Sequence, residues 1–124
     1  MGCGDGRIPI RAVEVFNVKK AVCVEIRKDL YERALSQVKA KGLEGRVVVI
    51  NDDMFNVDIS EATVITLFLL TSVNKMLRPK LERELRRGTR VVSHEFEIPG
   101  WDPIETYLFS DGVINHRVYL YVVR

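Results

Sequence analysis

Gly2-Cys3-Gly4-Asp5-Gly6-Arg7, at the start of the chain, is the stretch that decides the fold. Glycines allow the backbone to take positive φ angles and to approach a ligand closely. The stretch runs straight into Arg7–Phe16, where Ile8, Ala12 and Val15 share one face of a helix. A helix that follows such a loop directs its unpaired N–H groups toward it. The sequence therefore predicts a loop that binds a nucleotide-like ligand at the edge of an open α/β sheet.

Length and composition indicate one globular domain over residues 1–124. Hydrophobic residues make up 47% of the chain and charged residues 29%, which argues against disorder. The net charge of +2 is too small to indicate nucleic acid binding by itself. No apolar run reaches the ~18 residues of a membrane span. The two cysteines lack metal-ligand spacing and fit a reducing cytosol, so we expect a cytoplasmic protein without a metal site.

Two apolar runs, Ala21–Ile26 and Arg46–Asn51, predict parallel strands that are buried on both faces. The helix between them is expected to be capped by Asp29 and to stop at Gly42. Glu25 interrupts the first run near its end, about 20 residues after the glycine loop, where doubly wound folds place the acid that binds ribose hydroxyls. The alternative is that Glu25 is only the first exposed residue after the strand. The spacing favours the ribose role.

Alternation of helices and strands, followed by a terminal hairpin, predicts a Rossmann-like α/β fold. We expect an open, mostly parallel sheet in a three-layer αβα arrangement, with an antiparallel hairpin at its C-terminal end. Apolar residues on both faces of the last strand predict that it lies inside the sheet. The elements expected in the second half are a strand over Thr63–Leu70, a short helix from Thr71, a helix over Pro79–Arg86 and strands over Thr89–Phe96, Thr106–Ser110 and His116–Val123.

These features together resemble the seven-stranded, class I S-adenosylmethionine-dependent methyltransferases, whose sheet order is 3-2-1-4-5-7-6. The loop resembles the first motif of that class, whereas nicotinamide-binding folds require glycine at the position of Arg7. The runs Phe68–Asn74 and Ser93–Trp101 are more specific. They resemble the small crenarchaeal protein lysine methyltransferases, which are distantly related to the non-SET histone lysine methyltransferases. The resemblance covers essentially the whole chain.

The resemblance implies S-adenosyl-L-methionine as the cofactor. The glycine loop would wrap its methionine portion, Glu25 would hold the ribose, and Asp53 would accept a hydrogen bond from the adenine amino group. Asp52, in contrast, is expected to cap a turn. The residues expected to contact the cofactor are Gly2, Cys3, Gly4, Asp5, Gly6, Glu25, Ile26, Asp53, Met54 and Phe68.

The resemblance also implies protein substrates with exposed lysines. A lysine attacks only when neutral, and deprotonating a group of pKa about 10.4 near pH 7 costs about 4–5 kcal/mol unless burial helps. Phe68, Phe96 and Trp101 are aromatic candidates for that burial, although packing suits Trp101 better. His116 is expected to be structural. The expected catalytic residues, at the C-terminal ends of strands, are Thr71, Asn74, His94 and Glu95.

The chain differs from the family at its beginning, where members carry a helical segment and a central first strand before the glycine loop. Here only Met1 precedes the loop. Without that strand its two neighbours lie about 10 Å apart, with unpaired backbone groups. Either the sheet closes up, or a second copy donates a strand in a homodimer, or the natural product is longer. The apolar character of Met1 favours the last alternative.

Two other functions stay open. One is methylation of a small molecule or a nucleic acid. However, Leu69-Leu70-Thr71 replaces the Asn/Asp-Pro-Pro-aromatic signature that amino-methylating nucleic acid enzymes of this fold often carry, so a nucleic acid partner is disfavoured. The other is a catalytically silent remnant that acts as a binding or dimerising module, which the missing first strand favours.

Overall fold

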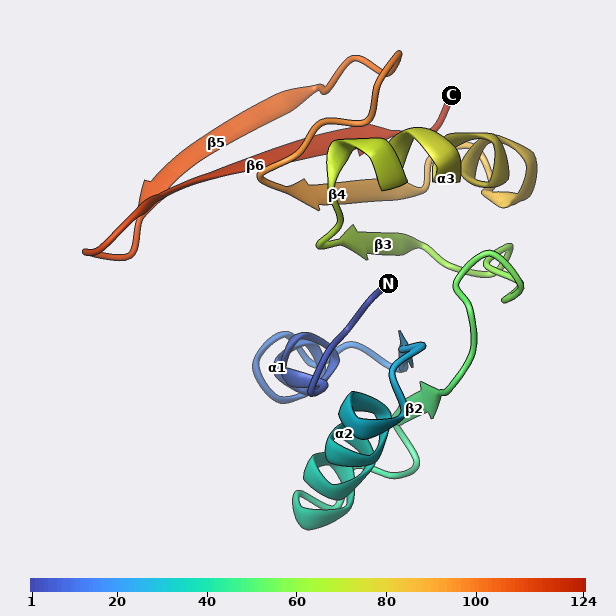
Figure 1. The fold of residues 1–124 in the computed structure, drawn as a ribbon, viewed down its shortest axis with the longest axis vertical. Coiled ribbons are helices and arrows are strands. Elements are labelled where there is room, and N and C mark those ends of the chain that lie inside the picture. Colours follow the sequence, from blue (N-terminus) through green and yellow to red (C-terminus); the bar gives the residue numbers. More distant parts are fainter. The chain divides into compact units, whose positions relative to one another are not determined.

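The computed structural model describes residues 1–124 and divides them into two compact units, residues 1–57 and 58–124, each with its own sheet (Figure 1). None of the helices is long and apolar enough to cross a membrane. The elements in chain order are α1 (Arg7–Phe16), β1 (Ala21–Val24), α2 (Lys28–Ala40), β2 (Val47–Ile50), β3 (Val64–Leu67), α3 (Thr71–Glu84), β4 (Arg90–His94), β5 (Glu105–Ser110) and β6 (Asn115–Val122).

In the first unit, β1 and β2 pair in parallel, in a register that runs from Ala21 opposite Val47 to Val24 opposite Ile50. Helices α1 and α2 share one apolar core with this sheet, because the apolar stripes that the sequence places on them converge there. The register brings the C-terminal ends of both strands to one edge. The buried residues at the centre of the core are Ile10, Val13, Val38 and Val47.

In the second unit, four strands lie in the order β3-β4-β6-β5. β3 and β4 are parallel, and β6 pairs antiparallel with both β4 and β5, so only β6 runs against the other strands. The interior position of the last strand is therefore confirmed. Helix α3 runs beside this sheet in Figure 1 and fully buries Leu77 and Leu81.

The predicted fold class is confirmed, since parallel strands alternate with helices and an antiparallel hairpin closes the chain. Within each sheet the strand order agrees with the order 3-2-1-4-5-7-6: β1 and β2 correspond to its strands 2 and 3, and β3-β4-β6-β5 corresponds to its strands 4-5-7-6.

Two local expectations were wrong. The helix beginning at Thr71 does not stop before Pro79; α3 continues through that proline to Glu84. Proline removes one backbone hydrogen bond, but burial of Leu77 and Leu81 on the inner face outweighs the loss. Asp29 is not the N-cap of α2, because Arg27 takes that position and Asp29 forms an ion pair with it at 2.8 Å. An acid in the first turn still interacts favourably with the helix dipole.

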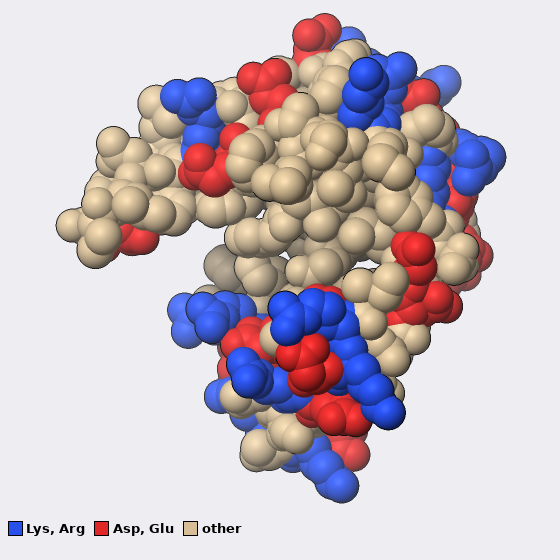
Figure 2. All heavy atoms as spheres, in the orientation of Figure 1, with Lys and Arg blue, Asp and Glu red and all other residues tan.

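The β5–β6 hairpin exposes much of its apolar surface. All of β5 is exposed, and Val113 at the turn has 89% of its surface in solvent. Figure 2 shows few charged side chains at the end of this hairpin, whereas charges of both signs crowd the surface over α1 and α2. The hairpin nevertheless holds ordered polar groups, because His116 in β6, opposite Phe109 of β5, lies 2.8 Å from the carboxylate of Asp111 at the turn.

We expect Gly6→Ala to destabilise the protein by about 2–3 kcal/mol, as measured by urea unfolding. Gly6 caps α1 at φ 85°, and a Cβ atom there would lie 3.1 Å from Cβ of Ala34 in α2. The left-handed backbone contributes about 1–2 kcal/mol of this cost and overpacking about 1 kcal/mol more. Gly4→Ala is the matched control, since Gly4 has φ 59° but open space around its added Cβ. Equal costs for the two variants would contradict the packing argument.

Candidate functional site

The glycine loop lies at the C-terminal end of β1. Gly2, Gly4 and Gly6 all have positive φ angles, of 65°, 59° and 85°. The backbone N–H groups of Gly2 and Cys3 both donate to the carbonyl of Val24, at 3.0 and 3.3 Å. The loop is thus attached to the last residue of β1 before it turns into α1. The loop running directly into a helix is as the sequence predicted.

Glu25 follows β1 directly and holds the loop in place. Its side chain is buried, and its two carboxylate oxygens accept hydrogen bonds from the backbone N–H groups of Gly4, at 2.9 Å, and Arg27, at 3.0 Å. A carboxylate accepts about four hydrogen bonds, so about two acceptor positions are left over. The idea that Glu25 is merely the first exposed residue after the strand is wrong. The carboxylate faces the glycine loop and also interacts electrostatically with the N-terminal ammonium of Met1.

The segment after β2 reaches the same edge. Asn51 donates from Nδ2 to the carbonyls of Glu25, at 2.9 Å, and Ile26, at 3.2 Å, which ties the ends of the two strands together. The sequence analysis missed this role of Asn51; its place directly after the β2 strand was the available signal. Ile26 itself is 63% exposed.

Asp52 and Asp53 both take part in a turn. Asp52 accepts from the N–H of Asp53 at 2.6 Å, as expected of a turn cap. Asp53 accepts from the N–H of Phe55 at 3.0 Å through one oxygen, Oδ1. Met54, between them, is partly buried. Asp53 therefore combines a local structural role with a carboxylate near the strand edge that carries Glu25.

Cys3 and Cys23 form a disulfide between the glycine loop and β1, with their Cα atoms 5.5 Å apart. The sequence analysis did not anticipate this bond, which leaves no free cysteine. The attachment of the loop to the end of β1 brings the two residues together, because the backbone N–H of Cys3 donates to the carbonyl of Val24, the residue after Cys23. Sequence spacing alone does not reveal it.

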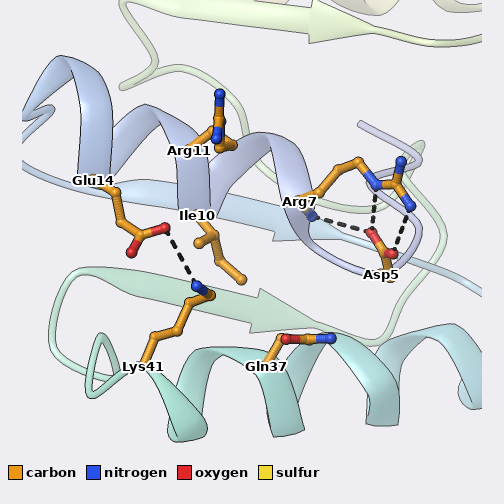
Figure 3. Close-up of a pocket in the computed structure, with 7 residues that line it drawn as sticks. All are labelled: Asp5, Arg7, Ile10, Arg11, Glu14, Gln37 and Lys41. Carbon is orange, nitrogen blue, oxygen red and sulfur yellow. Dashed lines mark hydrogen bonds and ion pairs between the residues drawn. The ribbon is translucent and has the colours of Figure 1, made fainter.

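Asp5 interacts with Arg7 at the start of α1 rather than with Glu25. Its carboxylate accepts from the backbone and guanidinium of Arg7, at 3.1 to 3.3 Å, and the hydrogen bond with this side chain lowers the pKa of Asp5 below its usual value. Both residues line a hollow of about 190 Å³ between α1 and α2 (Figure 3). Sites for drug-sized ligands measure about 300–1,000 Å³, so this hollow is too small to hold a whole adenosyl cofactor. It is lined by Asp5, Arg7, Ile10, Arg11, Glu14, Gln37 and Lys41.

In the second unit, Asn74 lies in the first turns of α3 and is fully buried. Its Nδ2 donates to Oγ of Ser93 and to the carbonyls of Phe96 and Glu97, at 3.2–3.3 Å. Its Oδ1 is the only buried side-chain N or O atom without a hydrogen-bond partner. A buried unpaired acceptor is costly, and such atoms call for a functional explanation. Thr71, at the start of α3, is exposed.

His94 ends β4 and is followed by Glu95. Nε2 of His94 lies 2.9 Å from Nδ1 of His116, and the ring of Phe68 stacks on the imidazole with centroids 4.8 Å apart. The structure thus brings His94, Glu95 and Phe68 together, and adds His116, which the sequence analysis expected to be structural. Only the antiparallel register of β4 and β6 reveals that neighbour.

Trp101 has a packing role, as expected. Its indole ring meets Tyr121 edge-on with centroids 5.9 Å apart, and its Nε1 donates to Glu82 at 2.8 Å. Phe96 is 40% exposed, so it keeps an accessible aromatic surface.

In a comparison with protein families, the family described as "ANTKMT methyltransferase domain" matches residues 1–105. A protein-lysine N-methyltransferase of Saccharolobus islandicus (strain REY15A) is 58% identical over 123 residues, which cover 99% of this chain and 76% of that protein. The adenine nucleotide translocase lysine N-methyltransferase of Mus musculus is 32% identical over 124 residues, and the chain spans 52% of its length.

Among solved structures, a similar one is described as an RNA methyltransferase from Salinibacter ruber in complex with S-adenosyl-L-homocysteine. It is 43% identical, with a TM-score of 0.90, and the alignment covers 98% of this chain and 76% of that one. S-adenosyl-L-homocysteine is what remains of S-adenosylmethionine after its methyl group has been transferred.

We expect the purified protein to contain no reactive thiol until it is reduced, because both cysteines are in the disulfide. Alkylation during lysis, followed by intact-mass measurement, checks this. Cys3→Ser is the matched variant: it frees Cys23, which is 1% exposed and is expected to react only after denaturation. Two alkylated cysteines in the freshly trapped, unreduced protein would contradict the disulfide.

Proposed function

Because this chain belongs to the ANTKMT methyltransferase domain family, we propose that it methylates lysine side chains of proteins, with S-adenosylmethionine as methyl donor. The relative from Saccharolobus islandicus, at 58% identity over nearly the whole chain, is the observation that carries the proposal. The family match runs through both compact units, and we propose that together they make one methyltransferase domain.

The residues at the edge of β1 and β2 fit an adenosyl cofactor. The space beside Gly4 is open, since an added Cβ would meet nothing within 4 Å, so a ligand can approach the backbone there. Glu25 has spare acceptor positions for the two ribose hydroxyls. Asp53 offers its second carboxylate oxygen to the adenine amino group, and Ile26 and Met54 supply apolar surface. When bound, the cofactor supplies an electrophilic methyl group on its sulfonium.

The five remaining residues of the predicted cofactor set have different roles. Gly2 and Gly6 shape the loop through their positive φ angles. Cys3 fixes it through the disulfide. Asp5 is engaged with Arg7, so we propose that it orients the loop and the start of α1 rather than contacting the ligand directly. We retain Phe68 as a proposed contact because its ring is 49% exposed.

For the lysine acceptor, we propose polar groups at the ends of β3 and β4. A lysine must lose a proton before it attacks, and burial in a dry site favours the neutral amine. Asn74 is fully buried, so we propose that it positions the segment after β4 through the hydrogen bonds of its Nδ2 to the carbonyls of Phe96 and Glu97. His94 and Glu95 offer a base and a negative charge nearby. Thr71 contributes a hydroxyl, and exposed faces of Phe68 and Phe96 attract a cation.

RNA is the second candidate acceptor, because the similar structure from Salinibacter ruber is described as an RNA methyltransferase. The net charge of +2 gives little support to a phosphate-binding surface. We therefore place protein lysine first and keep RNA as an arm of the experiment.

A second copy of this chain is a further proposed partner. β1 pairs with no strand other than β2, and β3 pairs with no strand other than β4, so each has an edge to which another strand can add. Sedimentation at several protein concentrations distinguishes monomer from dimer.

We also propose that the protein works in the cytoplasm, and that its Cys3–Cys23 disulfide is one of the few that persist in that compartment.

We expect methyl-labelled S-adenosylmethionine, incubated with the chain and a cell lysate, to label protein on lysine. Digestion with protease removes the label, ribonuclease does not, and amino-acid analysis finds methyl-lysine. Loss of the label on ribonuclease treatment would favour RNA as the methyl acceptor. Label in neither fraction, with the folded protein still binding cofactor, would favour a silent module.

We expect Glu25→Ala to weaken binding of S-adenosylhomocysteine at least about 100-fold in calorimetry. Two hydrogen bonds from ribose hydroxyls to a charged group, each worth about 1.5 kcal/mol, account for that factor. Glu44→Ala, which removes an exposed carboxylate from the same unit, is the control and is expected to bind normally. Near-UV circular dichroism verifies that both variants fold. Unchanged affinity in the Glu25 variant would refute the ribose role.

A further inference from the structure

Three potential metal ligands meet in the second unit. Nε2 of His94, Nδ1 of His116 and a carboxylate oxygen of Glu95 all lie within 4.8 Å of one another. The two imidazole nitrogens are 2.9 Å apart, and Oε1 of Glu95 is 3.9 Å from His94 and 3.8 Å from His116. The chain has no other histidines, so both of its imidazoles are in this one cluster.

The backbone directs the carboxylate into the cluster. Glu95 has φ 68°, a left-handed conformation that costs a residue with a side chain about 1 kcal/mol or more. Its N–H donates to the carbonyl of Arg117 at 2.7 Å, and its Oε1 accepts from the N–H of Arg117 at 2.9 Å. The side chain thus folds back over the end of the β4–β6 ladder, toward the imidazoles.

Asp111 fixes the outer side of His116. Its Oδ2 lies 2.8 Å from Nε2 of that ring. Its Oδ1 accepts from the backbone N–H groups of Val113 and Ile114, both at 2.8 Å, which fixes the carboxylate beside the ring. A carboxylate oxygen acts as acceptor, so Nε2 of His116 is the donor in this contact, and the lone pair of Nδ1 points toward His94 and Glu95. A carboxylate behind a histidine is the usual support of a metal-binding imidazole.

Aromatic rings restrain both imidazoles. Phe68 stacks on His94, and Phe109 stacks on His116 with centroids 4.9 Å apart and an interplanar angle of 16°. The His116 side chain is 15% exposed, that of His94 is 26% exposed and that of Glu95 is 38% exposed. The ligands are therefore held in place, while the carboxylate side stays open to solvent as an entry path.

We propose that His94, Glu95 and His116 bind one divalent transition-metal ion, for which Zn²⁺ is the best match. Ligands about 2.0–2.2 Å from a tetrahedral zinc ion lie about 3.3–3.5 Å from one another. The observed separations of 2.9, 3.8 and 3.9 Å bracket that value, so shifts of under about 1 Å suffice. Two imidazoles and one carboxylate suit zinc rather than magnesium or calcium, and the fourth position is left for water.

Binding replaces one hydrogen bond by metal–ligand bonds. Because Nδ1 of His116 is an acceptor, Nε2 of His94 carries the proton between them. When the metal binds, His94 changes tautomer, so that the proton on Nε2 is replaced by one on Nδ1; Nε2 of His94 and Nδ1 of His116 then donate their lone pairs to the ion. Composition and spacing do not indicate the site, since the histidines are 22 residues apart and meet only through strand pairing.

The test titrates Zn²⁺ into the EDTA-treated, disulfide-intact full chain by calorimetry, and repeats it with Co²⁺, whose visible spectrum reports tetrahedral coordination. We expect one ion per chain with a Kd below about 10 μM. His116→Ala and Glu95→Gln are expected to weaken binding at least 30-fold, and Asp111→Asn about 10-fold. Asp102→Asn, an exposed acid of the same unit, is the control with unchanged affinity.

Absence of one-to-one binding up to 100 μM metal would overturn the proposal, as would affinity that neither His116→Ala nor Glu95→Gln reduces. Glu95→Gln retains an acceptor for Arg117, so a folded variant with lost metal binding separates ligation from structural damage. The measurement uses neither cofactor nor acceptor, so it stands or fails independently of the proposed methyl transfer.

Discussion

A buried carboxylate holds the first unit in its functional shape. Glu25 accepts one backbone N–H from the glycine loop and another from the turn that starts α2, so it links the loop before α1 to the turn after β1. The loop could not keep three positive-φ glycines in one arrangement without such a partner, because glycine loses the most backbone entropy on ordering. Asn51 and the Cys3–Cys23 disulfide strengthen the same junction from β2 and from β1.

In the second unit, an amide side chain and a left-handed residue, rather than a buried carboxylate, shape the ends of the strands. Asn74 ties α3 to the segment after β4, and the left-handed Glu95 turns that segment away from the sheet. Neighbouring side chains hold the polar groups at this end in place. His94 contacts Phe68 and His116. His116 in turn contacts Asp111 and Phe109. Such ordering lowers the entropy lost on binding, which is why we consider these groups fit for recognition of an acceptor amine and of a metal ion.

Much of this follows from the sequence, and the exceptions have physical causes. Periodicity predicted α1 to the residue, because its apolar stripe and flanking breaks are local. The spacing of about 20 residues after the glycine loop predicted that Glu25 lies beside that loop, as it does. The helix and the strand between them have regular lengths, which makes such a spacing informative. Pro79 was misread as a helix start, since burial of Leu77 and Leu81 overrides its local preference. Asn51, the disulfide and His116 depend on strand register, which a single sequence does not display.

The central claim is that the Glu25 carboxylate, already bonded to Gly4 and Arg27, also receives the ribose of the cofactor. The most direct measurement is an amide NMR titration of the chain with S-adenosylhomocysteine. The account predicts that the Gly4 and Arg27 resonances shift in proportion to saturation, because their N–H groups share the carboxylate with the new ligand. Saturable binding that leaves both resonances in place would contradict it.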